Sequence, residues 1–189
     1  MAMEIRSLEI PEVKVIVPKR FGDHRGYFCE TYNKTAFHDA GIAAEFVQDN
    51  HSLSAAVGTV RGLHYQRPPF AQAKLVRVLR GAIKDVAVDM RIGSPTYRKS
   101  VSVELSAENG AQIFVPRGFL HGFATLDPDT EIAYKVDNHY SAECDGSVAW
   151  NDAELAIDWG IAGASAIVSE KDANAPKLTE FESPFKFKS

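Results

Sequence analysis

Short runs in which hydrophobic and polar residues alternate fill the middle of the chain. Val86, Val88 and Met90 alternate with Asp85 and Asp89. Successive side chains of a β-strand point to opposite faces, so this period of two predicts a strand with one buried face. Further alternating or short apolar runs lie at residues 13–17, 75–79, 101–105, 113–115, 119–123 and 130–136. The pattern predicts an all-β domain.

Turn-forming residues separate these runs at intervals of roughly 8–12 residues. The turns lie at residues 80–81, 93–95, 109–110, 116–118 and 127–129. Many short strands at this spacing are typical of a sandwich, a jelly roll or a barrel. The strands do not alternate with helices and no glycine-rich phosphate loop occurs. Both absences disfavour a doubly wound nucleotide-binding fold.

A short helix and two polar segments are predicted before this region. Asn33 is suited to cap a helix over residues 34–40, and Gly41 to end it. Residues 21–26 predict a charged, turn-rich loop, and residues 48–50 a polar cluster that leads into another loop. At the other end, residues 170–189 are polar and contain two prolines. This tail is predicted either to pack over the mouth of the barrel or to fray.

Composition narrows the class of protein. With 189 residues, 45% hydrophobic and 24% charged, a single globular domain is expected. The net charge of −4 gives no reason to expect nucleic-acid binding, so an anionic ligand would need local basic groups. The first eleven residues carry three charges and predict neither a signal peptide nor a membrane span. Two distant cysteines, Cys29 and Cys144, predict no disulfide framework and fit a reducing cytoplasm.

The segment at residues 61–66 (RGLHYQ) concentrates groups that suit chemistry on an anionic substrate. A histidine beside anion-binding groups on a strand suits proton transfer, although a packed strand-end histidine is the plainer alternative. Period two places His64 and Gln66 on one face of the strand, and Arg61 and Leu63 on the other. If Arg61 and His64 share a site, the strand must twist or bulge near Gly62.

Three further residues are candidates from their positions on predicted strands. Lys74 alternates with two valines and lies either on the inner face of the sheet or in solvent at the strand entry. Tyr134 is predicted to face the interior, as a packed tyrosine or as a proton donor. His121, between two phenylalanines, is either a core histidine or part of the site. Spacing alone does not separate these alternatives.

A histidine base normally needs a carboxylate that orients its ring. Many carboxylates are available, and Asp172 reaches His64 only if the tail folds back. A metal site is disfavoured, because His64 lacks the close His-x-His pair on which jelly-roll metal sites usually draw. His51, His121 and Glu131 do not have a supporting spacing either.

The chain also resembles the dTDP-4-dehydrorhamnose 3,5-epimerases, cupin-like jelly-roll enzymes of dTDP-L-rhamnose synthesis. The motifs follow in the same order over about residues 7–176, nearly the whole chain, which makes the resemblance specific. They are residues 23–30 (DHRGYFCE), 48–52 (QDNHS), 61–66 (RGLHYQ), 72–76 (QAKLV), 85–89 (DVAVD), 93–97 (GSPTY), 115–123 (VPRGFLHGF), 134–135 with Tyr140, and 150–152 (WND).

The resemblance implies a double-stranded jelly-roll β-barrel with short peripheral helices. Residues 1–189 would form one domain, in which the N-terminal segment contributes to a homodimer and the tail closes over the barrel. The substrate implied is dTDP-4-keto-6-deoxyglucose, epimerised to dTDP-4-dehydro-L-rhamnose for a bacterial cell-surface polysaccharide. The resemblance implies a cytoplasmic location. It implies no cofactor, no metal, no nucleic acid and no membrane partner.

The resemblance also implies a role for each matched residue. His64 would be the general base, paired with Asp172, and Tyr134 the general acid on the opposite face of the sugar. Tyr140 would stack on the thymine ring. Asp145 stands where the family often has glutamate, so its contact to the nucleotide is in doubt. The residues implied to bind substrate are Arg25, Glu30, Gln48, Asn50, Arg61, Lys74, His121, Tyr140, Asp145 and Lys171.

The sequence leaves rival functions open. A sibling enzyme that epimerises only C3 or only C5 would keep most of these residues. A 3,4-ketoisomerase is disfavoured by His64 and Tyr134 together. A non-catalytic sugar-nucleotide-binding jelly roll is disfavoured because His64, Asp172 and Tyr134 are all present.

Overall fold

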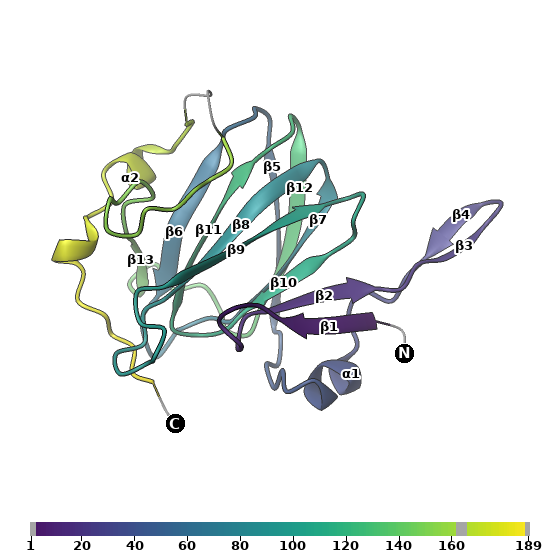
Figure 1. The fold of residues 1–189 in the computed structure, drawn as a ribbon, viewed down its shortest axis with the longest axis horizontal. Helices are drawn as coiled ribbons and strands as arrows, with labels where there is room; N and C mark the ends of the chain where they lie inside the picture. The colour runs from purple at the N-terminus through teal and green to yellow at the C-terminus, as the bar shows by residue number, and fades with distance from the viewer. Residues whose placement is uncertain (1–2, 162–165, 188–189) are drawn as a thin grey trace.

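Two antiparallel β-sheets pack face to face in the computed structural model, which describes residues 3–161 and 166–187 (Figure 1). Each sheet combines strands from distant parts of the chain. In spatial order, the six-stranded sheet contains β1 (Met3–Ser7), β2 (Lys14–Pro18), β10 (Gln112–Val115), β7 (Lys74–Arg80), β12 (Thr130–Val136) and β5 (Gln48–Ser54). The five-stranded sheet contains β13 (Asp145–Ser147), β6 (Val60–Gln66), β11 (Phe119–Thr125), β8 (Ala82–Asp89) and β9 (Ser100–Ser106).

The core between the sheets explains the alternating pattern of the sequence. Val76, Ile113 and Ile132 face it from the six-stranded sheet, and Ala87 and Phe123 from the five-stranded sheet. All five are buried. The prediction of an all-β domain is therefore confirmed. β8 is buried on both faces, because Ala87 faces the core while Val86 and Val88 pack on the outer face under the C-terminal segment, so the prediction of one buried face is wrong for this strand.

The prediction of a closed barrel is wrong. The edges of one sheet are β1 and β5, and those of the other are β13 and β9. Within the described residues, no strand pairing joins one sheet to the other, so the architecture is an open sandwich. Period-two patterning produces one buried face per strand in either architecture, and closure depends on pairing between edges that the pattern does not specify.

Two elements differ from the sequence-based prediction. β5 lies where a polar cluster and a loop were expected, and it pairs with β12 along its whole length. β1 was not expected and pairs with β2 at the opposite edge. Both are edge strands, and most of their side chains are exposed or only partly buried. Such strands lack a strong apolar pattern because their pairing comes from the neighbouring strand.

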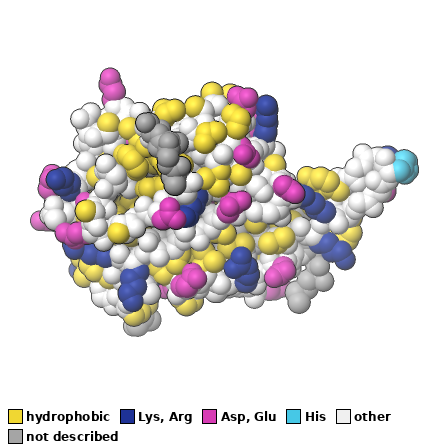
Figure 2. Space-filling view, turned by 45° about the horizontal axis from the view of Figure 1, so that its top comes forward, with side chains coloured by type: hydrophobic (Ala, Val, Ile, Leu, Met, Phe, Trp, Pro, Cys, Tyr) yellow, Lys and Arg dark blue, Asp and Glu magenta, His cyan; other side chains and the backbone are white. Residues whose placement is uncertain are grey.

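The predicted helix is confirmed as α1 (Lys34–Asp39). The Asn33 side chain accepts a hydrogen bond from the Ala36 amide at 3.1 Å, and Gly41 has a φ of +78° just past the end of the helix. Before it, β3 (Phe21–Asp23) and β4 (Gly26–Phe28) form a hairpin where a turn-rich loop was predicted. This hairpin, which we call the arm, stands clear of the body of the molecule (Figures 1 and 2).

The C-terminal segment covers the outer face of the five-stranded sheet. It contains α2 (Glu170–Ala173) and the 3-10 helix η1 (Leu178–Glu180). Leu178, Phe181 and Phe185 are buried against side chains of β6, β8 and β11. The segment is therefore fixed to the outside of the sheet by apolar packing, and α2 is held beside β6.

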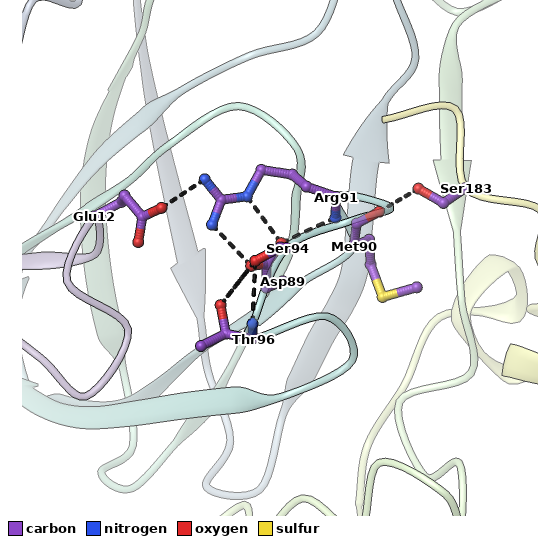
Figure 3. A network of polar contacts seen from close by, with 7 residues as sticks. All are labelled: Glu12, Asp89, Met90, Arg91, Ser94, Thr96 and Ser183. Atoms are coloured by element: carbon purple, nitrogen blue, oxygen red, sulfur yellow. Dashed lines mark hydrogen bonds and ion pairs between the residues drawn. The ribbon is translucent and has the colours of Figure 1, made fainter. Parts of the chain in front are cut away.

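A buried ionic network fastens the turn after β8 and reaches the tail (Figure 3). Asp89 accepts hydrogen bonds from the side chains of Arg91, Ser94 and Thr96, and Ser183 donates to the Met90 carbonyl. Burial by itself would raise the pKa of Asp89, but these hydrogen bonds outweigh it and lower that pKa to about 2.

Across the described ranges, no helix is long and apolar enough to cross a membrane.

Candidate active site

A bulge in the five-stranded sheet brings Arg61 and His64 to the same side of β6. His121 pairs with His64, Phe123 pairs with Arg61, and the register shifts between the two pairs. The bulge that a shared site required is thus confirmed. It coincides with Gly62, which has a φ of +139°. A Cβ on this glycine would approach the Gly122 Cα to 2.7 Å, so the close approach of β6 and β11 depends on the absence of a side chain.

An inner cavity of about 160 Å³ lies between the sheets at this bulge. Its polar side chains come from both sheets, with His64 on β6 and Tyr134 on β12. Phe123 and Ile132 contribute apolar side chains to its lining. The cavity is lined by Ser52, Arg61, His64, Lys74, His121, Phe123, Ile132 and Tyr134.

His64 is hydrogen-bonded to a carboxylate from the tail. Its Nε2 lies 2.6 Å from Oδ1 of Asp172, which is buried on α2. Ser169 caps α2 by accepting a hydrogen bond from the Asp172 amide at 3.1 Å. The tail folds back as the pairing required, and the carboxylate fixes the orientation of the imidazole ring.

The pKa of His64 is lowered from its ordinary value. Burial is the largest cause, and the charges of Lys74 and Lys171 add to it. The hydrogen bond and the charge of Asp172 act in the opposite direction. Because the lowering effects are larger, His64 is neutral at neutral pH and its free ring nitrogen is able to accept a proton.

Lys74 lies at the start of β7 and lines both the inner cavity and the outer cavity described below. Desolvation lowers its pKa to about 8, against the opposing charges of Asp85 and Asp145. No ion pair between described residues involves this lysine. Of the two alternatives left open by the sequence, the inner-face position is confirmed. A cation in this position suits a developing negative charge on a ligand oxygen.

His121 is buried and paired with a second carboxylate. Its Nε2 lies 3.0 Å from both oxygens of Asp85, a fully buried residue of β8. Sequence reasoning did not select Asp85 as a site residue. The available signal was an acidic residue within a largely apolar strand, because such a residue is rarely buried without a partner.

Tyr134 and Arg61 complete the inner cavity. Burial raises the pKa of Tyr134, and the charge of Arg61 only partly offsets this rise, so the phenol keeps its proton at neutral pH. Among hydrogen bonds between described residues, none uses the Tyr134 hydroxyl. Arg61 is held by the Ser54 hydroxyl and the Leu53 carbonyl, each at 3.1 Å. The Tyr134 hydroxyl is therefore available to a ligand in the cavity.

An outer cavity of about 250 Å³ continues from the inner one, with which it shares His64, Lys74 and Tyr134. The buried Gln66 fixes the chain at residues 139–141 on the edge of this cavity. Its side chain accepts a hydrogen bond from the Ser141 amide at 2.7 Å and donates one to the His139 carbonyl at 3.1 Å. The outer cavity is lined by Gln48, Asn50, His64, Tyr65, Gln66, Gln72, Lys74, Tyr134, Tyr140, Asp145 and Lys171.

Most of the residues selected from the sequence thus meet in two adjoining cavities. Asp172 joins them through His64 without lining either cavity, and Arg25 and Glu30 lie apart. Arg25 lies in the arm, where its side chain is 78% exposed and paired with Asp23. Neither Arg25 nor Glu30 lines the inner or the outer cavity. In the part of the chain that is described, no three histidine, cysteine, aspartate or glutamate side chains group closely enough to hold a metal ion.

Comparisons with known proteins show similarity over nearly the whole chain. Residues 7–180 match the family described as dTDP-4-dehydrorhamnose 3,5-epimerase. A protein of that name from Sinorhizobium fredii is 54% identical over 185 residues, which cover 98% of this chain and 94% of the relative.

Solved structures show the same similarity. A dTDP-4-dehydrorhamnose 3,5-epimerase from Bacillus anthracis with TDP and PPi bound has a TM-score of 0.90 and 49% identity, covering 94% of this chain and 100% of its own. A dTDP-6-deoxy-D-glucose 3,5-epimerase from Legionella pneumophila in complex with dTDP-4-keto-L-rhamnose has a TM-score of 0.94 and 42% identity, covering 99% of this chain and 100% of its own.

Proposed function

The chain belongs to the dTDP-4-dehydrorhamnose 3,5-epimerase family, and we propose that its two adjoining cavities are the active site for that reaction. The substrate is dTDP-4-dehydro-6-deoxy-D-glucose and the product is dTDP-4-dehydro-L-rhamnose. One observation supports this most strongly. A histidine paired with a carboxylate and a tyrosine hydroxyl that has no hydrogen-bond partner among the described residues line the same cavity from opposite sheets.

The base and the acid act on a carbon next to the ketone. The C3 and C5 hydrogens of the sugar are acidified by the C4 carbonyl. The free nitrogen of His64 takes the proton, and the electrons of the C–H bond move to the carbonyl oxygen as an enolate. Lys74 stabilises the negative charge on that oxygen. Tyr134 then returns a proton to the opposite face of the carbon, which inverts the centre.

The protonation states at neutral pH suit this division of roles. A histidine base must be neutral, and burial lowers the pKa of His64. A tyrosine acid must be protonated, and burial raises the pKa of Tyr134. After each inversion His64 carries an extra proton and Tyr134 lacks one. Exchange with solvent through the outer cavity restores both groups.

The substrate-binding roles follow from the two cavities. We place the sugar in the inner cavity beside Arg61, Lys74 and His121. The outer cavity then takes the diphosphate and the nucleotide, with Tyr140 stacking on the base. Gln48 and Asn50 lie on β5 at this mouth, and their side chains hydrogen-bond to each other at 2.9 Å. Asp145 and Lys171 lie across from them on the same cavity.

We further propose that the protein acts as a homodimer in the cytoplasm. The support for the homodimer is the arm, which stands clear of the body of the molecule (Figure 1) and carries the exposed aromatic residues Phe21, Tyr27 and Phe28. Exposed aromatic groups on a projecting hairpin suit burial against a second copy. Arg25 and Glu30 would then reach the partner's nucleotide. The two antiparallel sheets with crossed strand order also support a cupin-like jelly roll in a single domain.

Proton exchange tests the function directly. The protein is incubated with dTDP-4-keto-6-deoxyglucose in deuterated water, and the C3 and C5 proton signals are followed by NMR. We expect both signals to disappear and a product that a dTDP-4-dehydrorhamnose reductase accepts. Exchange at one carbon alone would identify a single-centre epimerase. Binding of dTDP without exchange would identify a binding protein or another sugar.

Asp172→Asn is expected to lower the exchange rate by about 10²-fold, because the imidazole ring loses its orientation. The carboxylate opposes the lowering of the His64 pKa, so its removal should lower that pKa further and move the acid limb of the pH–rate profile to lower pH. The profile distinguishes this role from a structural one. An unchanged rate and an unchanged acid limb would remove Asp172 from the pair.

Tyr134→Phe is expected to separate proton removal from inversion. His64 still removes the proton, but the proton donor on the opposite face is missing. The ratio of inverted product to exchanged substrate should fall by about tenfold or more. NMR measures both quantities in one sample. An unchanged ratio would assign the acid to another group.

A further inference from the structure

An ion pair crosses the wall of the outer cavity. Lys171, on α2, contacts Asp145, on β13, through its Nζ and the carboxylate Oδ2. Both residues line the cavity in which the diphosphate is placed. The lysine side chain is 48% exposed and the aspartate side chain 20% exposed. The pair is therefore accessible to an anion that enters from solvent.

The ion pair with Asp145 competes with any contact between Lys171 and an anionic ligand. The outer cavity has two cations on its wall, Lys74 and Lys171, and Asp145 neutralises one of them. The charge of Asp145 also reaches Lys74, whose pKa it raises, whereas Lys171 lowers that pKa. The three groups thus act on one another electrostatically across the cavity.

A partly exposed ion pair is weak enough to be exchanged. Pairs between exposed lysine and carboxylate side chains contribute little, equivalent to about a two- to fivefold change in an equilibrium constant. A diphosphate carries more charge than one carboxylate and has several acceptor oxygens. Asp145 also has a second neighbour, because the Tyr140 hydroxyl lies 3.5 Å from the same Oδ2. The aspartate therefore keeps a hydrogen-bond donor when the lysine leaves it.

We propose that Asp145 sets the affinity of the site by holding Lys171 in the free protein and releasing it to the diphosphate of the incoming nucleotide sugar. The inference rests on the proposed function, because that function places a diphosphate in the outer cavity. It assigns Asp145 as a competitor of the ligand for Lys171, not as a direct contact of the nucleotide base.

The test is a double-mutant cycle with inorganic pyrophosphate as the probe. Calorimetry measures its dissociation constant for the wild type, Asp145→Asn, Lys171→Gln and the double variant. We expect Asp145→Asn to tighten binding by about two- to fivefold, the range that an exposed pair allows. Lys171→Gln should weaken binding. In the Lys171→Gln background, Asp145→Asn should bring no comparable gain, because no lysine remains to be released.

A matched control removes a similar pair elsewhere. Lys84 and Asp158 form an ion pair with an Nζ to Oδ2 distance of 2.7 Å, and neither residue lines the two cavities. Asp158→Asn makes the same charge change and should leave pyrophosphate binding unchanged. A gain of the same size in this variant would mean that net charge, not the Asp145–Lys171 pair, sets the affinity, and would overturn the proposal.

Two other outcomes would overturn the proposal. If Asp145→Asn bound pyrophosphate more weakly than the wild type, or equally well, the aspartate would be a ligand contact or a residue that only stabilises the fold. If Asp145→Asn tightened pyrophosphate binding equally with and without Lys171, the charge of Asp145 would act on the anion directly and not through Lys171. Failure of the proposed function is separate, because a wild type that binds pyrophosphate but exchanges neither C3 nor C5 protons fails in the NMR experiment alone.

Discussion

His64→Ala is expected to lower proton exchange at both C3 and C5 by about 10³-fold, within the range that general base catalysis contributes. We expect one base to serve both carbons, because His64 lines the inner cavity with its ring fixed by Asp172. The other histidine there, His121, is bound to a carboxylate in the same way, but its side chain is only 8% exposed, against 31% for His64. Loss of exchange at both positions should be visible by NMR in deuterated water.

The control for this variant is another histidine paired with a carboxylate. His51 lies 3.1 Å from Glu131 through its Nε2 and does not line the inner or outer cavity. His51→Ala should leave exchange unchanged. Binding of dTDP by His64→Ala should persist, which shows that the fold is intact. Exchange at the wild-type rate in His64→Ala would refute its assignment as the base.

Lys74→Met is expected to lower kcat/KM by about 10²- to 10³-fold, the cost of losing one group that stabilises an oxyanion. Methionine keeps most of the side-chain volume, so packing around the cavity is preserved. Lys84→Met is the matched control, since this lysine lies on β8 and pairs with Asp158. Activity close to that of the wild type in Lys74→Met would leave the enolate without its proposed partner.

The pH dependence provides an independent signature of Lys74. The lysine must be protonated to stabilise the enolate, and burial lowers its pKa to about 8. Wild-type kcat/KM should therefore fall as pH rises through about 8, and the residual activity of Lys74→Met should lack this alkaline limb. At the acid end, the lowered pKa of His64 keeps the base neutral below its ordinary titration range, so activity should persist there.

The candidate site illustrates how far local patterns reach. The need for a bulge near Gly62 followed from alternation alone, because Arg61 and His64 lie on opposite faces of a regular strand. The spacing of Lys74 with the valines of β7 offered its inner-face position as one of two alternatives, and the tertiary structure decided between them. Both inferences concern residues on one strand, whose geometry repeats every two residues.

Partners from other parts of the chain were not predictable in this way. Asp172 lies 108 residues from His64, and spacing did not single it out among the many carboxylates. Asp85 was missed as the partner of His121. The resemblance to a family suggested Asp172, but residue chemistry by itself did not. Long-range pairs depend on how the elements pack. The sequence around an acidic residue does not show whether its carboxylate is paired or solvated in the fold.

The sequence by itself determined the all-β class, the capped helix α1, the inward faces of most strands and, through its ordered motifs, the family. These properties depend on side-chain periodicity and local hydrogen bonding, which act over a few residues. The tertiary structure alone decided that the sheets stay open, that the polar segment at β5 is a strand, and that the tail brings Asp172 to His64. Edge pairing, the packing of the tail on the outer face and the meeting of distant charges are set by contacts across the whole chain, and no local pattern encodes them.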